Sequence, residues 1–280
     1  MPASKKTPSR PSSSHGKADA GRVLITGASA GIGAELAREF ARHGHPLTLV
    51  ARRKEALAEL AAELARDHGV DVKTIAQDLA QPGGPAAVVK AAQAGGETIG
   101  VLVNNAGISE TGPFVDAPTE RLLALVDLNV RAMTEMTSRV LPGMVERGAG
   151  RVLNVSSMSA FQPVPTMGTY AASKVFVLSL TEALSEELRG TGVTVTALCP
   201  GFTQTDMIDE IQSNSAAVRK IPTQMLSKPA DVAALGYRAT MSGQTVAVPG
   251  LPNQIAAAWA QVTPRWLTRT MAGMATRAGS

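Results

Sequence analysis

The sequence is poor in aromatic residues and cysteine, and it has no long apolar run. Aromatic residues make up 3% of the 280 residues, whereas hydrophobic residues make up 44%. The core must therefore be built from Ala, Val, Leu, Ile and Met, which suits strands covered by helices on both faces. No apolar run approaches the roughly 18 residues of a membrane-spanning helix. The single cysteine, Cys199, excludes an intrachain disulfide, and we interpret it as a packed thiol in a cytoplasmic protein.

The folded part of the chain also lacks a strong charge, although the net charge is +4. Residues 1–20 contribute +3 of it, from Lys5, Lys6, Arg10 and Lys17 against Asp19, which leaves +1 for residues 21–280. A nucleic-acid-binding domain carries clustered basic residues, so we expect no nucleic-acid partner. Residues 1–20 are rich in Ser and Pro and have no apolar stretch, which predicts a disordered basic tail.

A glycine-rich turn lies between the first predicted strand, residues 23–25, and the first predicted helix, residues 34–43. The turn reads Thr26-Gly-Ala-Ser-Ala-Gly-Ile-Gly33. Glycine lets the backbone approach a pyrophosphate, and the helix N-terminus that follows supplies N–H groups and a positive dipole end. The predicted cofactor-binding residues of this turn are Gly27, Ser29, Ala30, Gly31, Ile32 and Gly33.

No acidic residue follows the second predicted strand, residues 47–50. In dinucleotide-binding folds an acid at this point bonds the 2′-hydroxyl of NAD and repels a 2′-phosphate. Arg52 and Arg53 stand there instead, and guanidinium groups bind phosphate through charge-assisted hydrogen bonds. The alternative is that both arginines are solvated residues that open a helix. We predict NADP(H) as the cofactor.

Predicted strands and helices alternate along the rest of the chain. Further strands are expected at residues 70–76, 99–103, 151–156 and 193–198, with a seventh near 246–250. This alternation implies right-handed crossovers and a ligand crevice at the carboxyl ends of parallel strands. We therefore expect one α/β domain over residues 21–250, a doubly wound Rossmann-type parallel sheet of about seven strands with helices on both faces.

Tyr170 and Lys174 lie four residues apart in a helix predicted over residues 169–189. One helix face therefore carries a phenol and an ammonium a turn apart. The cation favours the phenolate, which lowers the cost of moving the tyrosine proton. Ser156 and Ser157 end the preceding strand, where a hydroxyl can bond a substrate oxygen. The alternative is an ordinary helix with a Tyr and a Lys on its surface.

Together these motifs resemble those of the classical short-chain dehydrogenases/reductases over about residues 21–250. The matching residues are Thr26-Gly-Ala-Ser-Ala-Gly-Ile-Gly33, Asp78, Asn104-Asn-Ala-Gly107, Asn129, Ser157, Tyr170-Ala-Ala-Ser-Lys174 and Pro200-Gly201. The resemblance implies an oxidoreductase that transfers a hydride between NADP(H) and a small-molecule carbonyl or alcohol substrate, with a tyrosine as general acid or base. The alternative is a non-catalytic NADP(H)-binding regulator or scaffold with the same fold.

The resemblance also implies a role for each residue. Tyr170 would protonate the carbonyl oxygen, while Lys174 would lower the pKa of Tyr170 and bind the nicotinamide ribose. Ser157, thirteen positions before Tyr170, would orient the substrate, and Ser156 would face the sheet or the cofactor. Asn129 would bend its helix and hold a water that links Lys174 to solvent. The other expected cofactor-binding residues are Asp78, Leu79, Asn105, Ala106, Gly107, Tyr170, Lys174, Pro200, Gly201, Thr203 and Thr205.

The loop between Ser157 and Tyr170 and the segment after the sixth strand contain apolar residues. We expect them to line a pocket for an apolar substrate, although they could equally pack on the core. The pocket residues are Ser157, Met158, Phe161, Met167, Phe202, Met207 and Ile208, with Ile211, Met225 and Leu226 in the same mobile segment, residues 202–227. We expect no metal.

No acidic residue follows Asp231, and thirty residues follow Gly250. Residues 251–280 place apolar side chains on shared helical faces, which predicts an amphipathic helical extension. We favour packing on the core or on another subunit of a homodimer or homotetramer; a lid over the pocket and contact with an anionic membrane are the alternatives. The two apolar sets are Ile255, Trp259 and Val262, and Leu267, Met271 and Met274.

Overall fold

Seven strands form one parallel sheet in the order β3-β2-β1-β4-β5-β6-β7. The computed structural model describes residues 21–214 and 226–279. The order reverses between β1 and β4, which is the switch point of a doubly wound sheet. The predicted single α/β domain with a seven-stranded Rossmann-type sheet is confirmed. Its strands are β1 (Arg22–Thr26), β2 (Leu47–Ala51), β3 (Val72–Ala76), β4 (Ile99–Asn104), β5 (Gly150–Val155), β6 (Val193–Leu198) and β7 (Val246–Ala247).

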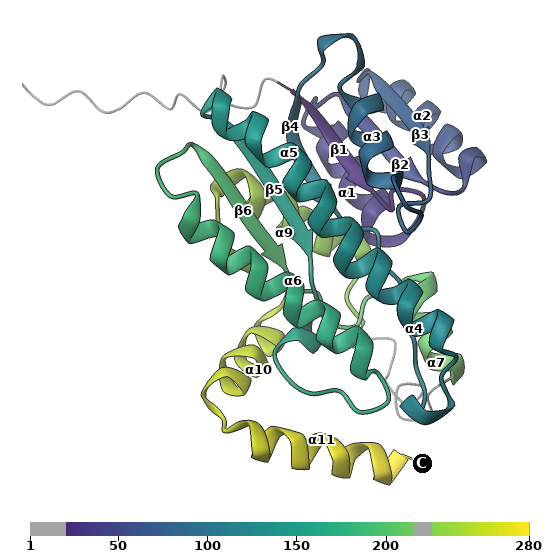
Figure 1. The fold of residues 1–280 in the computed structure, drawn as a ribbon, viewed down its shortest axis with the longest axis vertical. Helices are drawn as coiled ribbons and strands as arrows, with labels where there is room; N and C mark the ends of the chain where they lie inside the picture. The colour runs from purple at the N-terminus through teal and green to yellow at the C-terminus, as the bar shows by residue number, and fades with distance from the viewer. Residues whose placement is uncertain (1–20, 215–225, 280) are drawn as a thin grey trace, which may run out of the picture.

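Two layers of helices cover the sheet, one on each face (Figure 1). Successive residues of a strand point to opposite faces, so Val23 and Ile25 pack in one buried cluster and Leu24 in the other. The first cluster joins the sheet to α1 (Gly31–Arg42), α2 (Lys54–His68) and α9 (Pro229–Ser242). The second joins it to α3 (Gly84–Ala92), α5 (Met133–Arg147) and α6 (Gly168–Glu187).

The helix that begins at Thr119 is interrupted. α4 (Thr119–Val126) passes into a π-helical segment, η3 (Asp127–Ala132), before α5 begins. Asn129 lies in this segment and is buried. A π-helical turn holds one more residue than an α-helical turn, and here it carries a side chain that bonds the chain after β4. The Asn129 Oδ1 accepts from the Ile108 N–H at 3.0 Å, and its Nδ2 donates to the Ile108 carbonyl at 2.9 Å.

The third strand begins later than the predicted residue 70. Gly69 ends α2 in the left-handed conformation, with φ +67°, so the chain must turn before it can pair. The remaining short segments are 3₁₀ turns, η1 (Ala94–Gly96), η2 (Phe114–Asp116) and η4 (Met158–Ala160).

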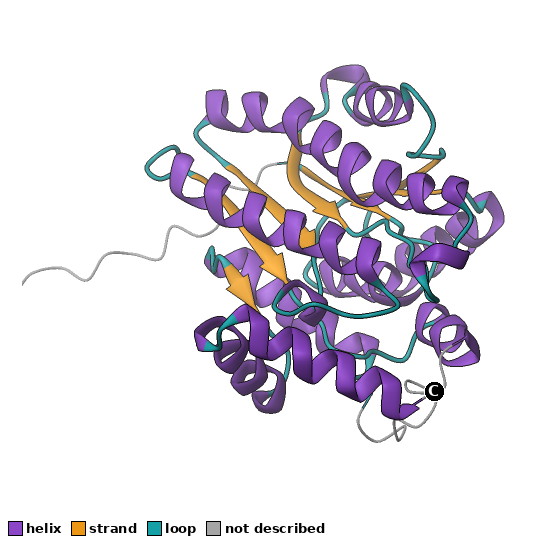
Figure 2. Ribbon diagram, turned by 60° about the horizontal axis from the view of Figure 1, so that its bottom comes forward, coloured by secondary structure: helices purple, strands orange, loops and turns teal. Residues whose placement is uncertain are grey.

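Three further helices lie at the end of the sheet where the strands finish. α7 (Asp206–Asn214) follows β6, and α10 (Leu251–Val262) and α11 (Arg265–Gly279) form the C-terminal extension (Figure 2). In the part of the chain that the structure describes, no helix combines the length and the apolar character needed to cross a membrane. The predicted tail, residues 1–20, and Met225 lie outside the described residues.

Candidate active site

At two positions of the turn between β1 and α1, the neighbouring backbone is too close for any residue other than glycine. A Cβ on Gly27, whose φ is +66°, would lie 2.8 Å from the Ala106 Cα, and one on Gly33 would lie 2.3 Å from the Gly27 carbonyl oxygen. Among the described residues, the start of α1 has no side-chain cap, and its first turn has no acid. Its positive dipole end therefore suits an anion such as a pyrophosphate.

Asn105 and Thr26 join the end of β4 to this turn. The Asn105 Nδ2 donates to the carbonyls of Thr26 and Gly27 at 3.0 and 3.1 Å. The Thr26 hydroxyl accepts from the N–H groups of Asn105 and Ala106 at 3.0 and 3.1 Å, and it donates to the Val103 carbonyl at 3.1 Å. The turn therefore holds its shape through bonds of the chain itself. Sequence reasoning did not single out Thr26, although it opens the glycine motif.

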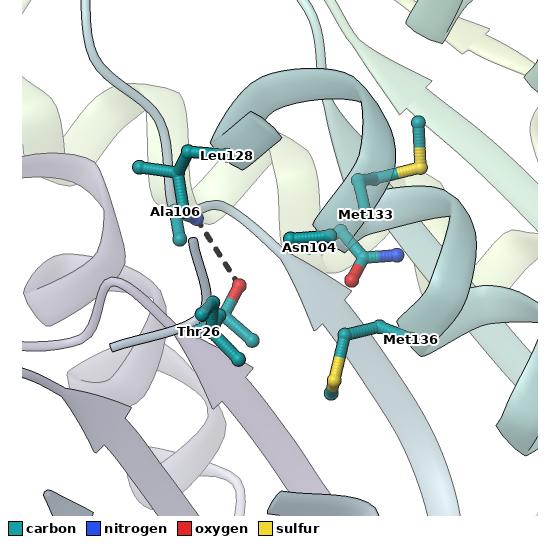
Figure 3. A pocket seen from close by; sticks show the side chains of 8 residues that line it. Thr26, Asn104, Ala106, Leu128, Met133 and Met136 are labelled. Atoms are coloured by element: carbon teal, nitrogen blue, oxygen red, sulfur yellow. Dashed lines mark hydrogen bonds between the residues drawn. The ribbon is translucent and has the colours of Figure 1, made fainter. Parts of the chain in front are cut away.

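A small cavity lies behind this junction (Figure 3). Its volume is about 10 Å³, room for one water molecule at most, so it is not the substrate site. Leu79 faces the cavity and is buried, so any contact of Leu79 with a cofactor would come from its backbone. The lining residues are Thr26, Leu79, Asn104, Ala106, Leu128, Ala132, Met133 and Met136.

Four predicted catalytic residues meet at the ends of β4 and β5. The hydroxyl of Ser157 lies beside the phenol of Tyr170 and acts to lower the pKa of that phenol. The Lys174 Nζ lies 5.6 Å from the centre of the Tyr170 ring and donates to the Val155 carbonyl at 2.9 Å. A Cβ placed on Gly107 would lie 3.1 Å from the Asn129 Oδ1 and 3.6 Å from the Lys174 Nζ. Asn129 and Lys174 therefore line the same small space.

Burial shifts the pKa values of Tyr170 and Lys174. It raises the pKa of Tyr170, and the neighbouring Ser157 hydroxyl opposes that rise. It lowers the pKa of Lys174 from 10.5 to about 8, because the ammonium leaves water for a site in which its side chain is almost fully buried. The predicted lowering of the Tyr170 pKa by Lys174 stays a prediction.

Ser156 faces α6 rather than the cofactor crevice. Its hydroxyl donates to the Lys174 carbonyl at 2.8 Å and lies beside the Cys199 thiol. Burial raises the pKa of the Cys199 thiol to about 12, so the thiolate that a nucleophile needs is strongly disfavoured. Both residues hold the ends of β5 and β6 against α6, as the interpretation of a packed thiol requires.

Arg52 and Arg53 are exposed at the end of β2, close to the glycine turn. The Arg53 guanidinium donates to Ser29, with Nη2 at 3.2 Å from the Ser29 carbonyl oxygen and 3.3 Å from its Oγ. An exposed guanidinium beside a phosphate-type turn can bind a further phosphate on the same ligand.

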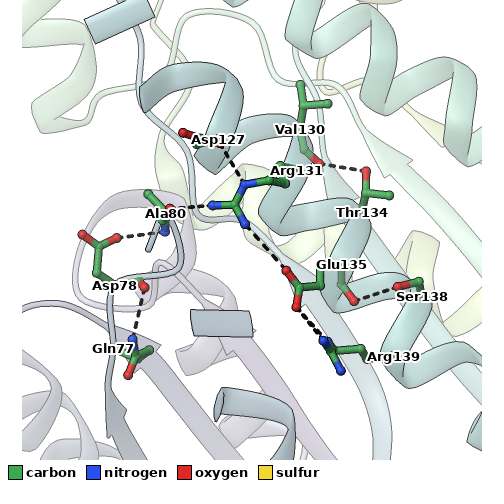
Figure 4. A network of polar contacts seen from close by, with 10 residues as sticks. All are labelled: Gln77, Asp78, Ala80, Asp127, Val130, Arg131, Thr134, Glu135, Ser138 and Arg139. Atoms are coloured by element: carbon green, nitrogen blue, oxygen red, sulfur yellow. Dashed lines mark hydrogen bonds and ion pairs between the residues drawn. The ribbon is translucent and has the colours of Figure 1, made fainter. Parts of the chain in front are cut away.

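The loop after β3 carries Asp78, whose Oδ1 accepts from the Ala80 N–H at 2.9 Å. Arg131 of the π-helical segment holds this loop from the other side (Figure 4). Its Nη2 donates to the Ala80 carbonyl at 2.5 Å, and its Nε pairs with Asp127 at 2.8 Å. The sequence analysis did not identify Arg131, because a single arginine in a helix has no local signature.

The end of β6 lies against both the glycine turn and the C-terminal extension. Thr203 is buried and its hydroxyl donates to the Gly201 carbonyl at 3.0 Å. The methyl group of Thr205 would lie 3.1 Å from a Cβ on Gly31. On the other side, the amide of Asn253 from α10 would lie 2.8 Å from a Cβ on Gly201, which follows Pro200. Sequence reasoning missed Asn253, since 52 positions separate it from Gly201.

The predicted substrate-pocket residues divide into three groups. Met167, Met207 and Ile208 pack with Ile211 and Leu226 around Tyr170, so α7 covers the tyrosine with apolar side chains. Phe161 packs instead with Cys199 and the segment around β7. Phe202 is exposed, and Met158 is half-buried, its N–H bonded to the Pro200 carbonyl at 2.8 Å. Within the described residues, no group of three or more His, Cys, Asp or Glu side chains could hold a metal ion.

The chain matches the short chain dehydrogenase family over residues 21–216. The very-long-chain 3-oxoacyl-CoA reductase of Laccaria bicolor is 37% identical over 200 residues, which cover 71% of this chain and 59% of that protein. The chain thus spans about 60% of the length of the very-long-chain reductases that it matches.

Solved structures give the same result. A short-chain dehydrogenase from Sphingobium yanoikuyae in complex with NADPH is 35% identical, with a TM-score of 0.78 over 91% of this chain and 94% of the other. A short-chain dehydrogenase/reductase from Burkholderia phymatum in complex with NAD is 27% identical, with a TM-score of 0.75 over 86% of this chain and 93% of the other. The chain therefore belongs to the short-chain dehydrogenase family.

Proposed function

We propose that this oxidoreductase uses NADP(H) to reduce a carbonyl compound that carries an apolar chain, or runs the reverse reaction. The observation that carries the proposal is the meeting of Ser157, Tyr170, Lys174 and Asn129 beside the glycine turn. Ser157 follows β5, Asn129 lies in η3, and Tyr170 and Lys174 lie one turn apart on α6. Chance surface placement therefore does not explain the cluster.

Each of these residues has its own role in the proposed reaction. The bound nicotinamide supplies the hydride that forms the new C–H bond at the carbonyl carbon. Tyr170 donates its phenolic proton to the carbonyl oxygen as the C=O π bond opens, and Ser157 orients that oxygen. The ammonium of Lys174 stabilises the phenolate that remains. A water held beside Asn129 would return a proton from solvent.

The apolar surroundings of Tyr170 favour a substrate with an apolar chain. Met167, Met207 and Ile208 pack around the tyrosine together with Ile211 and Leu226. Burying such a chain against this cluster would contribute about 0.8 kcal/mol per methylene. A 3-oxoacyl thioester fits this description, and the relative from Laccaria bicolor is named for that substrate class.

Tyr170→Phe tests the proposed acid. The chain has two tyrosines, so Tyr237→Phe is a matched control; Tyr237 stacks on His43, in the aromatic cluster of α1 and α9. NADPH oxidation by the purified chain should be measured against a panel of ketones and 3-oxoacyl thioesters. We expect Tyr170→Phe to lower kcat by about 100-fold or more, since a positioned general acid contributes that much, and Tyr237→Phe to retain it. Activity that survives in Tyr170→Phe would show that Tyr170 is not the general acid. Binding of the cofactor by the wild type without turnover of any substrate would favour a non-catalytic regulator.

Arg52→Asp with Arg53→Ala tests the cofactor preference. An aspartate at this point would repel a 2′-phosphate and accept from a ribose hydroxyl. We expect the ratio of kcat/KM for NADPH to that for NADH to fall by about tenfold to a hundredfold, the worth of one or two charge-assisted hydrogen bonds. Arg66→Ala, an exposed arginine farther along α2, is the control. An unchanged ratio would mean that other groups select the cofactor.

A further inference from the structure

The C-terminal helices present an apolar face that no other described part of the chain covers. On α10 the exposed apolar residues recur at intervals of four, four and three, which places them in one stripe. Val262 is 81% exposed and Trp266 of α11 is 63% exposed. We call this set the C-terminal apolar face; it comprises Leu251, Ile255, Trp259, Val262, Trp266, Met271 and Met274.

The opposite side of the same two helices is attached to the protein. Ala257 of α10 and Thr268 of α11 are buried. Asn253 lies against Gly201 at the end of β6, and its Nδ2 donates to the Pro249 carbonyl at 2.8 Å. The helices are thus held with one side inward and the C-terminal apolar face outward. Several exposed apolar side chains on two neighbouring helices mark a surface that binds something apolar.

The charges around this face have one sign. Arg265 and Arg269 are exposed on α11 one turn apart. The sequence contains no Asp or Glu after Asp231, so neither helix carries a carboxylate. Tryptophan and arginine on one amphipathic surface are typical of segments that lie in a lipid headgroup region, where the ring is half apolar and the cation meets lipid phosphate.

A second copy of the chain fits this face less well. In a symmetric dimer the same patch meets itself, so Arg265 and Arg269 of both copies would lie in one interface to which α10 and α11 supply no carboxylate. A lid function would require the apolar side chains to point inward, whereas Ile255, Val262 and Trp266 point to solvent. An anionic lipid surface satisfies both the apolar stripe and the two arginines, which have no ion-pair partner among the described residues.

We propose that α10 and α11 dock the protein on the surface of an anionic phospholipid bilayer, with the C-terminal apolar face in the headgroup layer. Figures 1 and 2 show α11 beside the loop that leads from η4 into α6, the loop that precedes Tyr170. Docking would therefore hold the loop that precedes Tyr170 close to the lipid. This surface is separate from the groups that carry the reaction.

The chain contains a natural probe, because its two tryptophans are Trp259 and Trp266 and both lie on this face. Vesicles of phosphatidylcholine with phosphatidylglycerol should shift the tryptophan emission of the full chain to shorter wavelength. Phosphatidylcholine carrying brominated acyl chains, mixed with phosphatidylglycerol, should quench that emission, since quenching requires contact with the hydrocarbon boundary. Vesicles of phosphatidylcholine alone should produce neither effect at the same lipid concentration.

Two pairs of matched variants test the apolar and the charged components. Ile255→Ser with Val262→Ser keeps both tryptophans and should abolish the shift, whereas Val115→Ser with Leu123→Ser, equally exposed elsewhere, should preserve it. Arg269→Gln should raise the lipid concentration at half-binding about fivefold, the effect of one basic residue at a lipid surface. Lys90→Gln, an exposed lysine on α3, should leave it unchanged.

Several results would overturn the proposal. Vesicle binding without a change in tryptophan emission would place the contact elsewhere, for example on the basic residues 1–20. Equal binding to neutral and anionic vesicles would show that the arginines do not contribute to lipid binding. Emission that is already shifted in lipid-free protein, and that depends on protein concentration, would show that a second copy covers the face.

Discussion

Lys174 holds a charge that its surroundings disfavour. Its Nζ donates to the Val155 carbonyl at 2.9 Å, and burial lowers its pKa to about 8. The spacing of Tyr170 and Lys174 predicted that the two groups share a helix face. It favoured a lowered pKa for Tyr170, whereas burial of the phenol by side chains of other elements raises that pKa.

We expect the free energy of unfolding to depend on pH through the ionisation of Lys174. Above about pH 8 the folded chain releases the Lys174 proton, whereas the unfolded chain keeps it up to about 10.5. The unfolded state then binds more protons, so the contribution of Lys174 to stability rises with pH over this window, by on the order of 3 kcal/mol.

Urea unfolding of the wild type and Lys174→Met at a series of pH values measures this contribution of Lys174 to the free energy of unfolding. The free energy of unfolding of the wild type should rise relative to that of the variant between pH 8 and 10.5. Lys90→Met, at an exposed lysine, should follow the wild type. Parallel curves for the wild type and Lys174→Met would contradict the lowered pKa.

At the scale of elements, the π-helical segment η3 connects two parts of the site. Asn129 faces Lys174 across Gly107, while Arg131, two residues on, holds the loop after β3 through the Ala80 carbonyl. One segment therefore positions both the proposed proton path and the loop that carries Asp78. The sequence predicted a helix here with Asn129 as an interruption, but not the π-helical turn that points the two side chains to different parts of the site.

We expect Arg131→Met to weaken NADPH binding about tenfold. The substitution removes a charged donor to the Ala80 carbonyl, and such a hydrogen bond contributes about 1.5 kcal/mol or more. Binding can be followed by the fluorescence of the bound dihydronicotinamide, which needs no substrate. Arg139→Met is the matched control, because Arg139 pairs with Glu135 in the same network but lies away from the loop (Figure 4). Equal affinities for the two variants would show that Arg131 does not position the loop.

At the scale of the whole molecule, the site is assembled where the strands end. Residues from β1, β4, β5 and β6 reach it from positions as far apart as Gly27 and Thr205. Parallel strands joined by right-handed crossovers finish at one edge of the sheet, so the alternation of strands and helices was sufficient to predict this convergence.

The C-terminal extension depends on the whole fold in a different way. The sequence predicted amphipathic helices over residues 251–280 and favoured packing on the core or another subunit. The structure attaches one side of α10 through Asn253 and Ala257 and leaves the other side exposed. Helical periodicity shows that two faces differ, but it does not show which face the rest of the chain will cover.

The sequence by itself determined the sheet, the glycine turn, the pairing of Tyr170 with Lys174 and the absence of an acid after β2. These features are local, since each depends on spacing within one strand, turn or helix. Only the tertiary structure decided that Ser157 meets the Tyr170 phenol, that Arg131 holds the Ala80 loop and that Asn253 lies on Gly201. Those contacts join residues distant in sequence, and their formation depends on how whole helices pack on the sheet.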